Sequence, residues 1–196
     1  MRGKIFLLLL TLALLAGCSM HTRYTLKIDL ASFLGDQTQG EIDLGSPTAL
    51  ELYLPDDDDG DPTTPDLDGM LIENPIKADR YLERVAFELE AILTETSGEP
   101  LDLNVEVYVA PPDATDLYHG EGTNIGSGTL HLDPNQQGTF AFDLKLVSGD
   151  DGFDLIAQGN FRFGIKLAGS AKGFKYELTT LNLALTTRPV GEILNP

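Results

Sequence analysis

Residues 161–167 read Phe-Arg-Phe-Gly-Ile-Lys-Leu, and residues 174–185 read Phe-Lys-Tyr-Glu-Leu-Thr-Thr-Leu-Asn-Leu-Ala-Leu. Apolar side chains take every second position in both stretches, which is the period of a β-strand with one buried face. In the second stretch the phase changes at Thr179-Thr180, which predicts a β-bulge or a strand that crosses between sheets. Gly169–Gly173, between the two stretches, predicts a turn. These residues therefore favour paired strands over helices.

The same alternation recurs along most of the chain. It predicts further strands at residues 24–30, 41–44, 50–54, 101–109, 129–132, 139–146 and 153–157. Residues 81–95 fit either a strand or a helical stripe, and a hairpin with residues 101–109 favours the strand. A short helix around 76–81 is compatible with this pattern. With about nine or ten short antiparallel strands, the sequence predicts an all-β fold, a β-sandwich with immunoglobulin-like or jelly-roll-like topology.

Two segments between the strands are predicted to be irregular. Residues 35–47 form turns, apart from the short strand 41–44. Residues 111–128 form a loop that contains four glycines between positions 120 and 128. A phosphate cradle needs a helix N-terminus that points at the anion, and no strand-to-helix unit surrounds these glycines. We therefore expect a flexible loop.

The formal net charge of −18 bears on the partners of the protein. Such a charge disfavours nucleic acid and anionic membrane surfaces as direct partners. The last part of the chain is locally basic, through Arg162, Lys166, Lys172, Lys175 and Arg188. Two interpretations are open: these cations pair with acidic strands of the same domain, or they form a basic face for lipid headgroups or an acidic polymer.

Residues 1–17 have the features of a secretory signal peptide. Arg2 and Lys4 precede an apolar run at 5–16, which is short beside the ~20 apolar residues that a membrane-spanning helix needs. Small residues then precede Cys18, which is the only cysteine of the chain. Once this thiol is used, no disulfide can form, so burial and hydrogen bonding must stabilise the exported domain.

Leu15-Ala16-Gly17-Cys18 resembles the lipobox of bacterial lipoproteins. The resemblance implies cleavage of the signal peptide 1–17 and transfer of diacylglyceryl to the Cys18 thiol, usually followed by acylation of the new amine with a fatty acid such as palmitate. It also implies a location in the bacterial cell envelope, anchored by lipid, and in the outer membrane if the organism has one, because Ser19 resembles an outer-membrane sorting signal. No family is identified for the mature domain.

The domain organisation follows from this leader. Residues 18–23 form a lipidated tether, and residues 24–196 form a single β-sandwich domain with an acidic loop at 55–75. Five tether residues at no more than ~3.5 Å each keep the domain within ~20 Å of its anchor. The membrane is therefore a partner through the N-terminal lipid.

The acidic loop is a candidate calcium site. Calcium prefers six to eight oxygen ligands, and alternating aspartates around a glycine turn can supply them from one loop. The candidate ligands are Asp57, Asp59, Asp61, Asp66 and Asp68. Fragments of the loop resemble EF-hands and thrombospondin type 3 repeats, but Pro55 and Pro75 take ligand positions and exclude a standard EF-hand. The alternative is a solvated loop whose like charges repel.

No catalytic set emerges from the sequence. His21, His119 and His131 lack the spacing of a zinc site and are expected to be surface imidazoles. Acids such as Asp113, Asp116 and Glu121 could form a glycosidase pair, but carboxylates are too abundant for that to be informative. Aromatic residues in strand phase are expected to be mainly core rather than a ligand platform: Tyr108, Tyr118, Phe161, Phe163, Phe174 and Tyr176.

We therefore expect a non-enzymatic envelope protein that acts as a binding or structural module. Its partner would be an envelope protein, a surface polymer or cations such as calcium. The alternative is an envelope hydrolase that acts on glycan or ester.

Overall fold

The computed structural model describes residues 22–56, 66–73 and 81–188. Eight strands dominate it, which confirms the predicted all-β fold. The elements are β1 (Thr25–Asp29), α2 (Ala31–Leu34), the 3-10 helix η1 (Gly35–Thr38), β2 (Gln39–Leu54), β3 (Met70–Ile72), β4 (Leu82–Glu95), β5 (Leu101–Ala110), β6 (Thr123–Leu132), β7 (Gln137–Leu146), α3 (Phe153–Ala157) and β8 (Phe161–Thr187). Within these ranges no helix is long and apolar enough to cross a membrane.

Some sequence predictions concern residues outside the described ranges. They are the leader with its lipobox and Cys18, most of the predicted helix around 76–81, and Asp57, Asp59 and Asp61 of the candidate calcium site.

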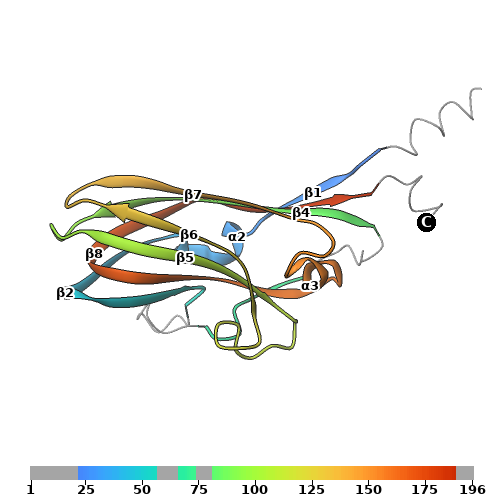
Figure 1. The fold of residues 1–196 in the computed structure, drawn as a ribbon, viewed down its shortest axis with the longest axis horizontal. Coiled ribbons are helices and arrows are strands. Elements are labelled where there is room, and N and C mark those ends of the chain that lie inside the picture. The colour runs from blue at the N-terminus through green and yellow to red at the C-terminus, as the bar shows by residue number, and fades with distance from the viewer. Residues whose placement is uncertain (1–21, 57–65, 74–80, 189–196) are drawn as a thin grey trace, which may run out of the picture.

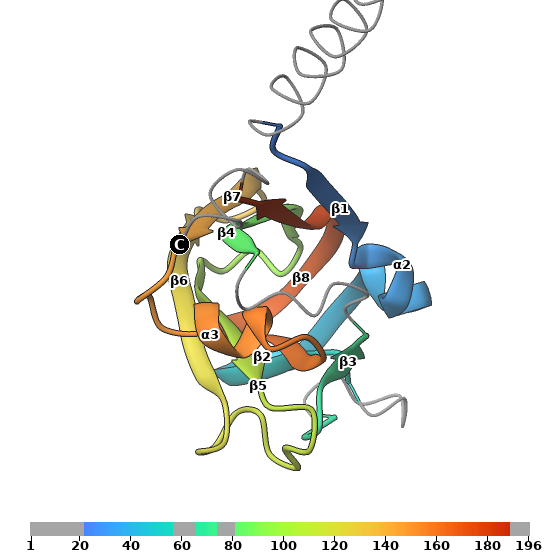
Figure 2. The same ribbon diagram turned by 90° about the vertical axis from the view of Figure 1, so that its right-hand side faces the viewer.

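Strand β8 organises the sheet, because five other strands pair with it in antiparallel register. Along one edge of β8 lie β3, β2 and β1 in succession, and along the other lie β5 and then β4. β6 extends the sheet beyond β5, and β7 extends it beyond β4. The two halves of β8 therefore belong to two layers, which face each other across one core (Figures 1 and 2).

The turn predicted at 169–173 is wrong, because β8 runs through it without interruption. Here β8 passes from the layer of β5 to the layer of β4, and β2 shifts its register opposite this point, between Asp43 and Thr48. A side chain at Gly169 would clash with the backbone of Asp102 on β5. The glycines thus permit close strand contact where the sheet bends. The structure consequently has fewer and longer strands than predicted.

The irregularity predicted at Thr179-Thr180 is confirmed as a β-bulge. Glu90 on β4 pairs with Thr180, and the next residue, Ala91, pairs with Leu178. Thr179 is the extra residue, and its hydroxyl donates to the carbonyl oxygen of Glu90 at 3.1 Å. Such an insertion reverses which side of the strand faces the core, as the changed phase of the leucines indicated.

Residues 82–95 form a strand, which settles the choice between helix and strand. The predicted hairpin is nevertheless wrong, because β4 and β5 both pair with β8 and not with each other. The backbone N–H of Thr96 donates to the carbonyl of Gly173, so the connection crosses over the bend of β8. β4 and β5 thus lie in opposite layers.

Two segments predicted to be irregular contain regular structure. Within 35–47, η1 is followed by β2, which begins at Gln39 and includes the strands predicted at 41–44 and 50–54. Within 111–128, β6 begins at Thr123, so Gly126 and Gly128 are strand residues and not part of a flexible loop. Side chains at these two glycines would clash with the rings of Phe142 and Phe140 on β7. The glycines therefore let β6 approach β7.

Residues 153–157 form the short helix α3 instead of the predicted strand. Gly152 precedes it with φ 80°, a left-handed conformation that glycine adopts readily. Phe153, Ile156 and Ala157 are buried, which is helical spacing and not alternation. Five residues are too few to distinguish the two periods by sequence.

The core lies between the layers and is aromatic at its centre. Phe161, Phe163 and Phe174 are each at most 1% exposed, which confirms the core assignment of these three rings. Phe163 lies 5.3 Å from Phe87 on β4, measured between ring centroids. The same buried cluster runs from Leu30 to Leu185, so burial joins both layers.

Candidate functional site

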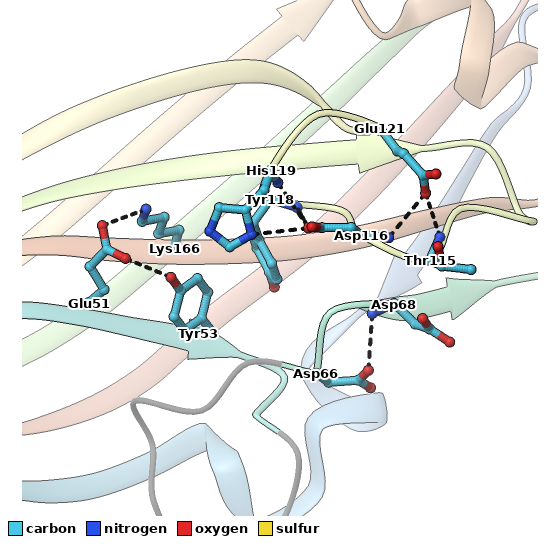
Figure 3. A network of polar contacts seen from close by, with 10 residues as sticks. All are labelled: Glu51, Tyr53, Asp66, Asp68, Thr115, Asp116, Tyr118, His119, Glu121 and Lys166. Carbon is cyan, nitrogen blue, oxygen red and sulfur yellow. Dashed lines mark hydrogen bonds and ion pairs between the residues drawn. The ribbon is translucent and has the colours of Figure 1, made fainter.

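A network of tyrosines and charged groups lies on the outer side of the sheet, where β2, β8 and β5 meet the loop 111–122 (Figure 3). We call Tyr53, Tyr108 and Tyr118 the tyrosine cluster. The centroid of the Tyr118 ring lies 4.8 Å from that of Tyr53 and 5.6 Å from that of Tyr108, and both pairs pack edge to face. Tyr53 and Tyr118 are buried with Leu117, which makes a second, smaller apolar cluster outside the main core.

Lys166 on β8 joins this cluster to a carboxylate on β2. Its Nζ lies 2.7 Å from Oε1 of Glu51 and 5.7 Å from the centroid of the Tyr53 ring. The Tyr53 hydroxyl donates to Oε2 of Glu51 at 2.7 Å. The hydrogen bonds from Lys166 and Tyr53 lower the pKa of Glu51, while burial raises the pKa of Tyr53. Glu51 is therefore ionised and Tyr53 is a neutral donor at neutral pH.

Tyr108 repeats this arrangement on the neighbouring strand β5. Its hydroxyl donates to Oε2 of Glu106 at 2.9 Å, and Glu106 pairs in register with Lys166. Burial raises the pKa of Tyr108, as it raises that of Tyr118. Each tyrosine of strands β2 and β5 thus keeps its proton and bonds to a carboxylate two residues earlier.

The loop 111–122 is fixed by its own carboxylates. Oε2 of Glu121 accepts from the backbone N–H groups of Thr115 at 2.6 Å and of Asp116 at 3.1 Å, which lowers the pKa of Glu121. Oδ1 of Asp116 accepts from the N–H groups of Tyr118 and His119, and lies 3.1 Å from Nδ1 of His119. These bonds place the Tyr118 ring over the sheet.

Two of the three acids considered for a glycosidase pair therefore have a structural use. Asp116 and Glu121 lie in one loop, and both accept hydrogen bonds from its backbone. Asp113 is exposed and lies two residues after Pro111, where the loop begins. Among the described residues, no buried side-chain nitrogen or oxygen atom lacks a hydrogen-bond partner. The network therefore fastens the loop to the sheet.

Only two candidate calcium ligands lie within the described ranges. Oδ1 of Asp66 accepts from the backbone N–H of Asp68 at 3.2 Å, and Oδ2 of Asp68 lies 3.7 Å from Nη2 of Arg162. Asp66 also lines a groove of about 550 Å³ beside α2, together with Asp36 and Asp56. In the described part of the chain, no three acids, histidines or cysteines come close enough to hold a metal ion.

The structure does not bring the candidate histidines together. His119 lies in the loop before β6, and His131 lies near the other end of that strand. Nδ1 of His131 lies 2.6 Å from Oδ1 of Asp102, and this hydrogen bond raises the pKa of His131. His21 is outside the described ranges.

The basic residues of β8 support the first interpretation of the charge pattern. Besides the Lys166–Glu51 pair, Lys175 lies 3.1 Å from Glu41 on β2, and Arg162 lies near Asp68 before β3. Three of the five cations therefore pair with acids on β2 or just before β3, along the same edge of β8.

The aromatic prediction holds in part, and it missed Tyr53. Tyr108 and Tyr118 pack in the tyrosine cluster and not in the main core. The Tyr176 hydroxyl donates to the carbonyl of Gln37 at 3.3 Å. The sequence did not indicate that Glu51, Tyr53 and Lys166 form one network, because each stands on the polar phase of its strand. The tyrosines at 53 and 108 also stand on the outward side of their strands. A large aromatic side chain there was the one feature of the sequence that could indicate that another segment covers this face.

Comparisons with known proteins identify no family for this chain. No family model and no curated protein matches it. A structure of infectious bursal disease virus, Gx strain, is 10% identical with a TM-score of 0.42, over 87% of this chain and 35% of that chain. The chain thus spans about a third of the viral chain. A bacterial lipoprotein from Bacteroides thetaiotaomicron VPI-5482 is 14% identical with a TM-score of 0.40, over 85% of this chain and 84% of that chain. At these TM-scores neither similarity carries an argument about function.

Proposed function

We propose that this protein is a lipid-anchored module of the bacterial cell envelope that works by binding or as a structural component. The observation that carries the proposal is the lipobox Leu15-Ala16-Gly17-Cys18, seven residues before the first strand begins at Thr25. A thiol at this place suits acylation because the thiolate is a far better nucleophile than a hydroxyl.

The fold is compatible with a module that presents a rigid surface. The polar groups of the candidate site bond to one another, and the loop 111–122 is held on the sheet by the Tyr118 ring and the Asp116 and Glu121 carboxylates. A rigid surface loses little conformational entropy when it binds. The partner class that we propose is an envelope protein or a surface polymer.

A Cys18→Ser variant tests the anchor. Wild-type protein should incorporate radiolabelled palmitate and stay with membranes after an alkaline carbonate wash, whereas the variant should incorporate no label and appear in the soluble fraction. A variant that remained in the washed membranes would contradict the proposal. Crosslinking in intact cells, followed by purification of the wild-type protein, would then identify the partner.

Calcium binding by the acidic loop is a separate proposal, supported by the density of aspartates at 56–68. Thermal unfolding of the protein in millimolar calcium and in excess chelator tests it. A higher Tm in calcium, lost in an Asp57→Asn/Asp59→Asn variant, would support it. An identical Tm in both solutions would exclude it.

A further inference from the structure

One corner of the sheet differs in chemistry from the rest of this acidic chain. It lies where β1 begins, β8 ends and β4 begins, which Figure 2 views end-on. Its exposed side chains include three arginines and two tyrosines. We call Arg23, Tyr24, Tyr81, Arg84 and Arg188 the arginine–tyrosine corner.

Backbone pairing brings these five residues together. The carbonyl of Tyr24 accepts from the N–H of Thr187 at 2.8 Å, and the N–H of Arg188 donates to the carbonyl of Tyr81 at 2.6 Å. Arg84 pairs in register with Thr186, which pairs on its other side with Thr25. Three adjacent strands therefore hold the corner in a fixed arrangement.

The corner has an excess of positive charge. Arg23 binds Glu83 in a bidentate ion pair, at 2.6 Å and 3.1 Å. Arg84 and Arg188 attract the same carboxylate from farther away, and within the described ranges neither lies within 4.0 Å of a carboxylate oxygen. Three arginines thus act on one acid, which only Arg23 contacts, although Asp150, Asp151 and Asp154 lie in the nearby turn and α3.

Both tyrosines of the corner are exposed to solvent, as residues that contact a membrane surface would be. The Tyr24 side chain is 61% exposed and the Tyr81 side chain is 43% exposed, which is more than most large side chains of a folded domain. Tyrosine has an apolar ring and a polar end, and it is enriched where a membrane meets water. Guanidinium groups bind phosphate with two parallel hydrogen bonds.

We propose that the arginine–tyrosine corner rests on the anionic phospholipid headgroups of the membrane that carries the anchor. The inference relies on the proposed lipidation of Cys18, because five residues between Cys18 and Tyr24 allow a reach of no more than ~20 Å. The corner is therefore the part of the described domain closest to the bilayer along the chain. The long axis of the sheet then points away from the membrane.

Tryptophan fluorescence tests this orientation, because the chain contains no natural tryptophan. The Tyr81→Trp variant reports on the corner, and Gln136→Trp reports on the opposite end of β4, since the carbonyl of Gln136 accepts from Glu95. Fourteen residues of β4 separate the two ends, so the probes stand roughly 40 Å apart. The lipidated proteins are reconstituted into vesicles of phosphatidylcholine and phosphatidylglycerol that contain brominated lipid.

We expect bromine to quench the emission of Trp at 81 and to leave that of Trp at 136 unchanged. Arg84→Gln with Arg188→Gln should reduce the quenching at 81, as should high salt or vesicles of phosphatidylcholine alone. Lys172→Gln with Lys175→Gln removes the same charge from β8, outside the corner, and should leave the quenching unchanged.

Flotation of the vesicles separates the two hypotheses. Protein that fails to float with the vesicles contradicts the lipid anchor itself. If the protein floats but bromine quenches Trp at 81 and at 136 equally, the proposed orientation is wrong and the anchor is retained. The same conclusion follows if Arg84→Gln with Arg188→Gln leaves the quenching at 81 unchanged.

Discussion

The Glu95 carboxylate at the end of β4 accepts a hydrogen bond of 2.6 Å from the backbone N–H of Asn135, in the turn between β6 and β7. Glu95 is only 3% exposed and is the only buried charged residue among those described. It also accepts from the N–H and the hydroxyl of Ser97 and from the N–H of Gly98. One carboxylate thus joins two turns at the same end of the molecule.

Glu95→Gln should destabilise the protein by about 1–3 kcal/mol, because a neutral amide replaces a charged acceptor. The NH2 group of the glutamine would also face backbone N–H donors that now bond to a carboxylate oxygen. Urea unfolding followed by circular dichroism measures this loss. Glu99→Gln removes an exposed carboxylate from the same turn and serves as the control. If both variants unfolded at the same urea concentration, Glu95 would have no special role in stability.

The same carboxylate predicts a pH dependence. Burial alone raises the pKa of Glu95, but the hydrogen bonds from Asn135, Ser97 and Gly98 outweigh it and lower the pKa from 4.5 to about 2. A carboxyl group with a depressed pKa in the folded state stabilises that state above its unfolded pKa. Its contribution is therefore lost as the pH falls from about 4.5 through about 2.

We expect the free energy of unfolding of the wild type to fall in this acid range more steeply than that of Glu95→Gln. Other carboxylates with lowered pKa values, such as Glu51 and Glu83, remain in both proteins and give a common background. Unfolding curves at several pH values measure the difference between the two slopes. Parallel slopes would show that Glu95 titrates with the same pKa in both states.

Tyr118 is predicted to hold the loop 111–122 through its ring and not through its hydroxyl. The hydroxyl lies 3.5 Å from the carbonyl oxygen of Leu54, which is long for a hydrogen bond, whereas the ring contacts Tyr53 and Tyr108. Tyr118→Ala should cost about 3–5 kcal/mol, as truncation of a buried aromatic ring does. Tyr118→Phe should cost less than ~1 kcal/mol.

Limited proteolysis distinguishes a local effect from a global one. If the ring fastens the loop, Tyr118→Ala should be cleaved within 111–122 under native conditions, while Tyr118→Phe resists like the wild type. Cleavage of both variants at the same rate would show that the hydroxyl, and not the ring, is decisive.

Local patterns predicted which residues form strands, but not how the strands pair. Alternation predicted the strand at 101–109, and the phase change predicted the bulge at Thr179, whereas alternation left residues 81–95 open between strand and helix. β4 and β5 both pair with β8 and not with each other. This pairing depends on burial across the whole fold, and the turn residues at 97–100 carry no information about it.

The outer site was harder to predict for the same reason. Glu51 and Tyr53 lie on β2 and Lys166 lies on β8, and the lysine meets the other two only because these strands pair in register, with Glu51 beside Ala168 and Tyr53 beside Lys166. On a sequence each is an ordinary outward residue of its strand. The role of Tyr53 becomes visible only when Tyr118 of the loop 111–122 packs against its ring.

Gly126 provides a test of the contact between β6 and β7. In the sequence this glycine marks a flexible loop, yet in the structure a Cβ there would lie 2.5 Å from the end of the Phe142 ring. Gly126→Ala should therefore destabilise the protein by about 1–3 kcal/mol, as overpacking does, although alanine favours a strand more than glycine does. Ser127→Ala changes the adjacent exposed position and should be nearly neutral.

A second substitution separates a steric clash from a requirement for backbone freedom at Gly126. Phe142→Leu shortens the side chain that blocks the new methyl group, so the double variant should be more stable than the sum of the two single effects predicts. A double-mutant cycle from thermal or urea unfolding measures this coupling. Additive effects would mean that the methyl group does not meet Phe142 and that β6 and β7 are farther apart in solution than this contact requires.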